Sequence, residues 1–87
     1  MDISDIQFLT SSAIYRELAL RSQEFLTYRA YPEGSELRQL SEDTFFNLAV
    51  EYITQTGVPR SQAEQFCNNP DQLTELALRV RSILGAG

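Results

Sequence analysis

The side chains that could do chemistry in this chain of 87 residues are carboxylates and one thiol. The acidic residues of the middle third are Glu33, Glu36, Glu42, Asp43 and Glu51. A pair of carboxylates at a suitable separation could bind a divalent cation, but no loop in this region has the ligand spacing of a calcium site. Glu42 and Asp43 are explained by the first turn of a helix, where the helix dipole stabilises acidic side chains. We expect no metal site, and we interpret these residues as a solvated acidic face that can attract a basic partner.

Several residue types on which catalysis commonly depends are missing. The chain has no His, which is the commonest general base and the commonest metal ligand. All seven basic residues are Arg, so Schiff-base chemistry and the usual P-loop cation are excluded. Cys67 has no neighbouring Lys or His to lower its pKa, so we interpret it as a small core residue rather than a redox-reactive or intermolecular thiol. We therefore expect a protein without cofactors that is not an enzyme; catalysis by carboxylates and Tyr alone is the alternative.

Composition and charge restrict the partners and the compartment. A net charge of −5 disfavours the phosphate contacts that give most non-specific nucleic-acid affinity, so nucleic acid is not the expected partner. A content of 43% hydrophobic and 22% charged residues is typical of a folded domain, and a single cysteine allows no internal disulfide. No stretch has the roughly 20 apolar residues of a membrane span, and the N-terminus lacks the features of a signal peptide. We expect one soluble, cytoplasmic domain over residues 1–87.

Three pairs of residues have the spacing of a capping box, in which a side chain caps a helix and a Glu or Gln three residues later bonds back to it. They are Ser4 with Gln7, Ser61 with Glu64, and Asn69 with Gln72. Caps of this kind at three places in a short chain predict helices.

Breakers and caps predict where the helices begin and end. The first long helix is predicted from Ser4 or Ser12 to Ala30, and residues 1–11 form a lead-in helix or an arm. Residues 35–40 form a single turn before a helix over 41–56. A short helix follows from Pro59 or Ser61 to Cys67, a last helix runs over 69–84, and residues 85–87 fray. Gly34 and Gly57 are expected to take positive φ angles in the connections.

Apolar residues recur at helical spacing in each long segment. They are Ile14, Tyr15, Leu18, Ala19, Phe25 and Leu26 in the first; Phe45, Leu48, Ala49, Tyr52 and Ile53 in the second, widened by Phe46 and Val50; and Leu73, Leu76, Ala77, Val80, Ile83 and Leu84 in the last. Short connections between such helices predict an all-α fold, a small bundle of four or five helices packed in antiparallel or orthogonal fashion.

Some aromatic and apolar residues fall off these stripes and could remain in water. Tyr28 lies at the edge of the first stripe beside Arg29, Tyr31 lies next to the Pro-Gly loop, and Phe46 and Leu78 lie off the main faces of their helices. Exposed apolar side chains with Tyr and Arg at their rim are the usual composition of a protein interface. These five residues are therefore the candidate interface, and the expected partner is another protein or a second copy of this chain.

The segment from Ala49 to Asn69 loosely resembles the helix-turn-helix family of DNA-binding proteins. In this resemblance Gly57 is the turn glycine and Val58 the buried turn residue. The DNA-contacting residues that it implies are Arg60, Ser61, Gln62 and Gln65. The segment departs from the family pattern at Ile53, where a small residue is usual, and at Pro59 after the turn. The alternative function is thus a small transcription-linked regulator.

Residues 25–40 and 56–84 also resemble small all-helical cyanobacterial proteins associated with heterocyst differentiation. The resemblance is one of texture, since the chain lacks Lys, is rich in Arg and Gln, and has short capped helices. It implies no functional residue.

Overall fold

The computed structural model describes residues 2–8 and 11–86, which form an all-α fold. Its elements are a 3-10 turn, η1 (Ile3–Asp5), and the helices α1 (Ala13–Tyr28), α2 (Glu36–Gln55), α3 (Arg60–Asn68) and α4 (Pro70–Ala86). No strand occurs among these residues, so the predicted fold class is confirmed. The backbone of α4 is helical to Ala86, two residues past the predicted end of the last helix, and Gly87 lies outside the described residues.

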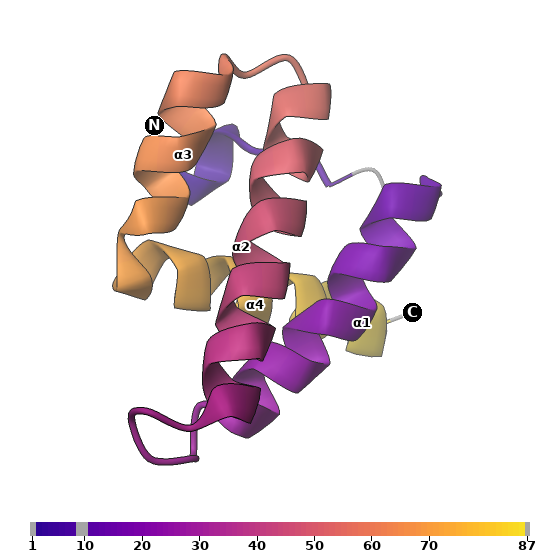
Figure 1. Ribbon diagram of the computed structural model, residues 1–87. Helices are drawn as coiled ribbons and strands as arrows, with labels where there is room; N and C mark the ends of the chain where they lie inside the picture. Colours follow the sequence, from indigo (N-terminus) through magenta and orange to yellow (C-terminus); the bar gives the residue numbers. More distant parts are fainter. Residues whose placement is uncertain (1, 9–10, 87) are drawn as a thin grey trace.

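The helices make a flattened body of 34 × 31 × 19 Å. α1 and α2 lie side by side, α3 packs beside α2, and α4 crosses behind and packs on α1 and α3 (Figure 1). α2 therefore contacts helices on two sides, as its broad apolar surface predicts. The N-terminal segment folds back so that η1 contacts α4.

The first long helix begins at the second of its two predicted caps. The Ser12 hydroxyl accepts a hydrogen bond from the Tyr15 N–H at 3.1 Å, and Ser4 instead lies inside η1. The Ser4–Gln7 capping box is wrong because Asp2 and Asp5 form the box at this turn: the Asp2 N–H donates to the Asp5 carboxylate at 2.9 Å. The residues before Ser12 are thus an arm with one helical turn; positions 9 and 10 lie outside the described residues.

α2 is longer than predicted because it begins at Ser35 instead of Ser41. The Ser35 hydroxyl accepts from the Arg38 N–H at 3.5 Å, directly after Gly34 turns the chain with a φ of +91°. Ser41 is only 5% exposed and lies inside the helix, where its hydroxyl donates to the Arg38 carbonyl at 2.9 Å. A serine that bonds to its own preceding turn does not interrupt a helix, so residues 35–40 and 41–56 form one element.

The ends of α3 and α4 confirm one predicted cap and correct another. Asn69 caps α4, accepting from the N–H groups of Asp71 at 2.9 Å and Gln72 at 3.3 Å. The return bond of a capping box is absent, since the Asn69 N–H donates to the Phe66 carbonyl at 3.3 Å. The Ser61–Glu64 box is wrong, because α3 already begins after an extended Pro59 and has no side-chain cap. Gly57 has the expected positive φ, at +106°.

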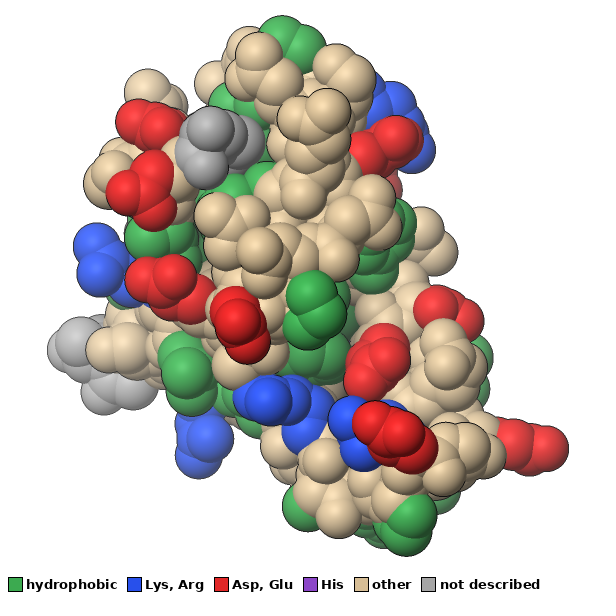
Figure 2. All heavy atoms as spheres, turned by 90° about the vertical axis from the view of Figure 1, so that its left-hand side faces the viewer, with side chains coloured by type: hydrophobic (Ala, Val, Ile, Leu, Met, Phe, Trp, Pro, Cys, Tyr) green, Lys and Arg blue, Asp and Glu red, His purple; other side chains and the backbone are tan. Residues whose placement is uncertain are grey.

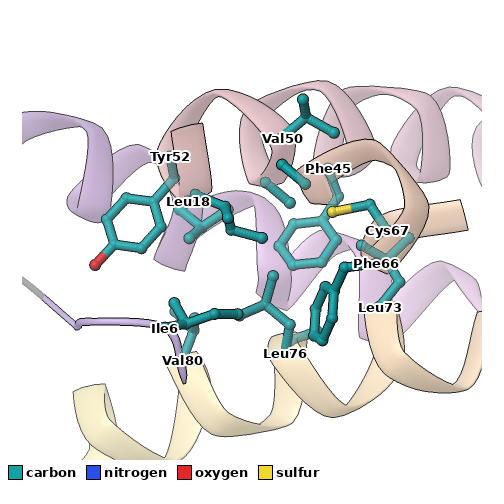
Figure 3. Close-up of a cluster of buried hydrophobic side chains, with 14 of the residues drawn as sticks. Ile6, Leu18, Phe45, Val50, Tyr52, Phe66, Cys67, Leu73, Leu76 and Val80 are labelled. Carbon is teal, nitrogen blue, oxygen red and sulfur yellow. The ribbon is translucent and has the colours of Figure 1, made fainter. Parts of the chain in front are cut away.

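The core lies where α1, α2, α3 and α4 meet, and Ile6 from the arm also packs into it (Figure 3). Phe45 is completely buried, and its ring stacks on Phe25 with centroids 4.9 Å apart. Most residues of the predicted stripes are buried, whereas Ile14, Leu26, Leu48, Phe46 and Ile83 lie at the margin. Ser22, which falls outside the predicted stripe, is fully buried because its hydroxyl donates to the Ala19 carbonyl at 2.6 Å.

Two tyrosines in this core differ in how their hydroxyl groups are satisfied. The Tyr15 and Tyr52 rings meet edge to face at 5.9 Å. The Tyr52 hydroxyl donates to the Gln7 carbonyl and so ties the arm to α2. The Tyr15 hydroxyl is buried and has no hydrogen-bond partner in the described part of the chain. Burial, followed by the nearby Tyr52, raises the pKa of Tyr15.

We expect Tyr15→Phe and Tyr52→Phe to change stability in opposite directions. Removing the unpaired Tyr15 hydroxyl ends a desolvation cost and should raise the free energy of unfolding by about 1 kcal/mol. Removing the Tyr52 hydroxyl leaves a carbonyl without its partner and should lower the free energy of unfolding by about 1 kcal/mol. Urea unfolding of both variants checks the signs. Equal destabilisation by the two changes would contradict the assignment of partners.

Candidate functional site

Hydrogen bonds within the loop between α1 and α2, and one from Arg38, connect this loop to α2. The Tyr31 N–H donates to the Tyr28 carbonyl at 3.0 Å, and the Ser35 N–H donates to the Pro32 carbonyl at 3.1 Å. The Arg38 guanidinium donates to the Tyr31 carbonyl at 2.9 Å and to the Glu42 carboxylate at 3.3 Å. The loop is thus bonded within itself and, through Arg38, to α2, and one surface lies on either side of the α1–α2 seam.

One of these surfaces is apolar. We call it the α1–α2 patch, and it consists of Tyr28, Tyr31, Leu37 and Leu40. The Tyr28 and Tyr31 rings touch edge to face at 5.2 Å, while Leu37 and Leu40 are 49% and 64% exposed. Tyr28, Leu37 and Leu40 line the same hollow of about 330 Å³. Exposed apolar side chains that line one hollow are a feature of surfaces that bind partners.

The rim of the α1–α2 patch carries an ion-pair cluster on α1. Arg21 lies 3.0 Å from the carboxylate of Glu17, one turn earlier on α1, and 2.9 Å from the carboxylate of Glu24, one turn later. Hydrogen bonds to Glu24 and then to Glu17 raise the pKa of Arg21 above its ordinary value. The patch therefore has an apolar centre and a charged edge, which is the usual composition of a protein interface.

The second surface, which we call the charged groove, lies between α1, the loop, α2, the end of α3 and the start of α4. It has a volume of about 450 Å³, and its floor is formed by Phe25, Phe46 and Leu73. Its rim carries four carboxylates and two guanidinium groups, those of Glu33, Glu42, Asp43, Asp71, Arg29 and Arg38. Acidic and basic side chains likewise surround hydrophobic ones on the lower part of the face in Figure 2.

The five residues of the predicted interface are divided between different places. Tyr28 and Tyr31 belong to the α1–α2 patch, whereas Arg29 and Phe46 line the charged groove. The Arg29 guanidinium lies 5.9 Å from the centre of the Phe25 ring. Leu78 is 52% exposed on α4 and lines neither surface.

Sequence reasoning missed Leu37 and Leu40 as members of an exposed surface. The available signal was their spacing of three residues, which places Leu37 and Leu40 on one helix face. That face continues to Thr44, which lines the same hollow as Tyr28, only if residues 35–40 and Thr44 belong to one helix. In the structure they do, because α2 begins at Ser35.

The residues of the helix-turn-helix resemblance lie on one short helix. Arg60, Ser61, Gln62 and Gln65 are all exposed on α3, and Val58 before it is half-buried against the core. The Arg60 guanidinium pairs with the Glu64 carboxylate at 3.1 Å, which reduces its attraction for a phosphate. It is also the single basic residue within α3.

Cys67 lies in the core, as predicted. It is 2% exposed, and burial raises the pKa of its thiol to about 12. A thiol at that pKa is not a nucleophile at neutral pH. The described residues contain no group of three or more acidic or Cys side chains placed to hold a metal ion.

Among the described residues, none of the helices combines the length and the apolar character needed to cross a membrane. The chain matches no protein-family model, no curated protein and no solved structure.

Proposed function

We propose that this protein is a non-enzymatic helical module that acts by binding another protein, including a second copy of itself, and that it serves a regulatory or adaptor role. The observation that carries the proposal is the α1–α2 patch, in which Leu37 and Leu40 are about half exposed or more beside two touching tyrosines. Burial of such a surface by a partner removes apolar area from water, which is the main favourable term in association.

The absence of His, Lys and paired cysteines from the sequence supports a function that does not depend on catalysis. The buried Cys67 adds to this, because its raised pKa keeps the thiol protonated.

Light scattering after size exclusion, over a dilution series, tests the proposal. We expect the wild type to show a mass that rises with concentration, and Leu37→Ser/Leu40→Ser to remain a monomer, because the double change removes the exposed apolar side chains of the patch. Leu20→Ser/Leu78→Ser is the matched control, since these leucines are 50% and 52% exposed elsewhere. If the wild type does not self-associate, pull-down from a native lysate with the wild type and both double variants tests binding to another protein. A strictly monomeric wild type that captures nothing would overturn the proposal.

The alternative of DNA binding has one supporting observation, the exposure of the four polar residues on α3. It predicts that the protein binds random duplex DNA at about 50 mM salt, that added salt weakens the binding, and that Arg60→Glu abolishes it. Absence of binding under these conditions would end this alternative.

A further inference from the structure

We propose that the charged groove binds a cationic peptide segment of a partner protein, in which Lys or Arg side chains alternate with apolar ones. This inference goes beyond the function proposed above and does not depend on the α1–α2 patch, because the two surfaces have no lining residue in common.

The floor of the groove fits the stem of a long basic side chain. Phe25 and Leu73 are only 4% and 7% exposed, so the half-buried Phe46 on α2 supplies most of the apolar surface that these three residues offer. The aliphatic stems of Lys and Arg cover apolar surface of this kind while the charged head remains near water. The volume of about 450 Å³ accommodates a few side chains.

The charges at the rim favour a cation. Glu42 is already paired with Arg38, and the Asp43 carboxylate accepts a hydrogen bond from the Gln39 amide at 3.0 Å, which leaves its charge in place. Glu33 and Asp71 have no cationic partner within the described part of the chain. The first turn of α4 stabilises Asp71, so Glu33 and Asp43 supply most of the uncompensated negative charge.

Arg29 is the group that opposes a cation in the groove. Its guanidinium lies over the Phe25 ring and makes no ion pair within the described residues. Replacing it should therefore strengthen the binding of a basic peptide, whereas replacing the carboxylates should weaken it. Attraction by the net charge of the whole chain predicts the same two signs, so a matched loss of two carboxylates outside the groove is needed to show that the site is local.

A bare metal ion fits the groove less well than a cationic side chain. The carboxylates at the rim come from the loop, α2 and α4, and no three acidic or Cys side chains in the described residues converge on one point. An ammonium or guanidinium group needs no such convergence, because it makes directional hydrogen bonds to single carboxylates.

The test is a fluorescence-anisotropy titration with a short labelled peptide of alternating Lys and Leu, at about 50 mM and about 300 mM salt. We expect saturable binding that weakens with salt, and none by the same peptide with Glu in place of Lys. Glu33→Gln/Asp43→Asn should weaken binding about fivefold, because each removes a partly exposed charge contact. Arg29→Gln should tighten it.

Two controls make the outcome decisive. Glu51→Gln/Glu75→Gln removes the same net charge at exposed positions outside the groove and should change the affinity less than about twofold. Leu37→Ser/Leu40→Ser should retain the peptide, so a failure of the function proposed above is distinguishable from a failure of peptide binding. The proposal is overturned if the wild type does not bind the Lys peptide. It is also overturned if Glu33→Gln/Asp43→Asn and Glu51→Gln/Glu75→Gln lose equal affinity, or if Leu37→Ser/Leu40→Ser is the one variant that loses affinity.

Discussion

Phe45→Ala should destabilise this protein by about 3–5 kcal/mol. The side chain is fully buried between α1 and α2, stacked on Phe25 in the cluster drawn in Figure 3. Its removal loses the transfer free energy of the ring and leaves a cavity that neighbouring helices fill only in part. A domain of this size has a total stability of roughly 5–10 kcal/mol, so the variant should lose a large part of it.

Urea unfolding followed by circular dichroism measures this change. Leu40→Ala is the matched control on the same helix, because a side chain that is 64% exposed should change the free energy of unfolding by less than about 0.5 kcal/mol. A loss below about 1 kcal/mol for Phe45→Ala would show that α1 does not pack on α2 through this ring.

The stability of the protein should fall above pH 9 because of Cys67. The thiol has a pKa near 9 when exposed, whereas burial raises it to about 12 in the folded protein. Between these two values the unfolded chain releases a proton that the folded chain retains, so rising pH favours unfolding. The stabilising contribution is present in full below pH 9 and is lost as pH rises through about 12. The expected slope is about 1 kcal/mol per pH unit. Burial of Tyr15 adds a loss of the same sign at higher pH.

Free energies of unfolding measured in urea from pH 8 to about pH 11 check this prediction. Cys67→Ala should have a flatter dependence on pH than the wild type, whatever its stability at neutral pH. Parallel curves for wild type and Cys67→Ala would contradict the assignment.

The helices and much of the core could be predicted from the sequence because both depend on neighbouring residues. Leu73, Leu76 and Val80 recur at the spacing of one helix face on α4, and all three are buried. Asn69 followed by Pro70 predicts the start of α4 because a cap and its N–H donors lie within three residues of one another.

Errors occurred where two local signals competed. Ser35 and Ser41 both have the chemistry of a cap, and only the position of Ser41 against the core decides that it lies inside α2. Ser22 is polar, so its place in the core does not follow from the apolar pattern, but a bond to its own helix satisfies the hydroxyl and permits burial.

The amino-acid sequence by itself therefore determined that the protein is helical, where most helices end, and that Cys67 and most of the described stripe residues lie inside. Tertiary structure alone decided that Tyr28 and Tyr31 share a surface with Leu37 and Leu40, that Arg29 and Phe46 face a groove closed by α4, and that the Tyr15 hydroxyl has no partner within the described part of the chain. The physical reason is range: caps and periodicity act within a few residues, whereas a patch, a groove or an unpaired buried atom depends on which helix faces meet across the chain.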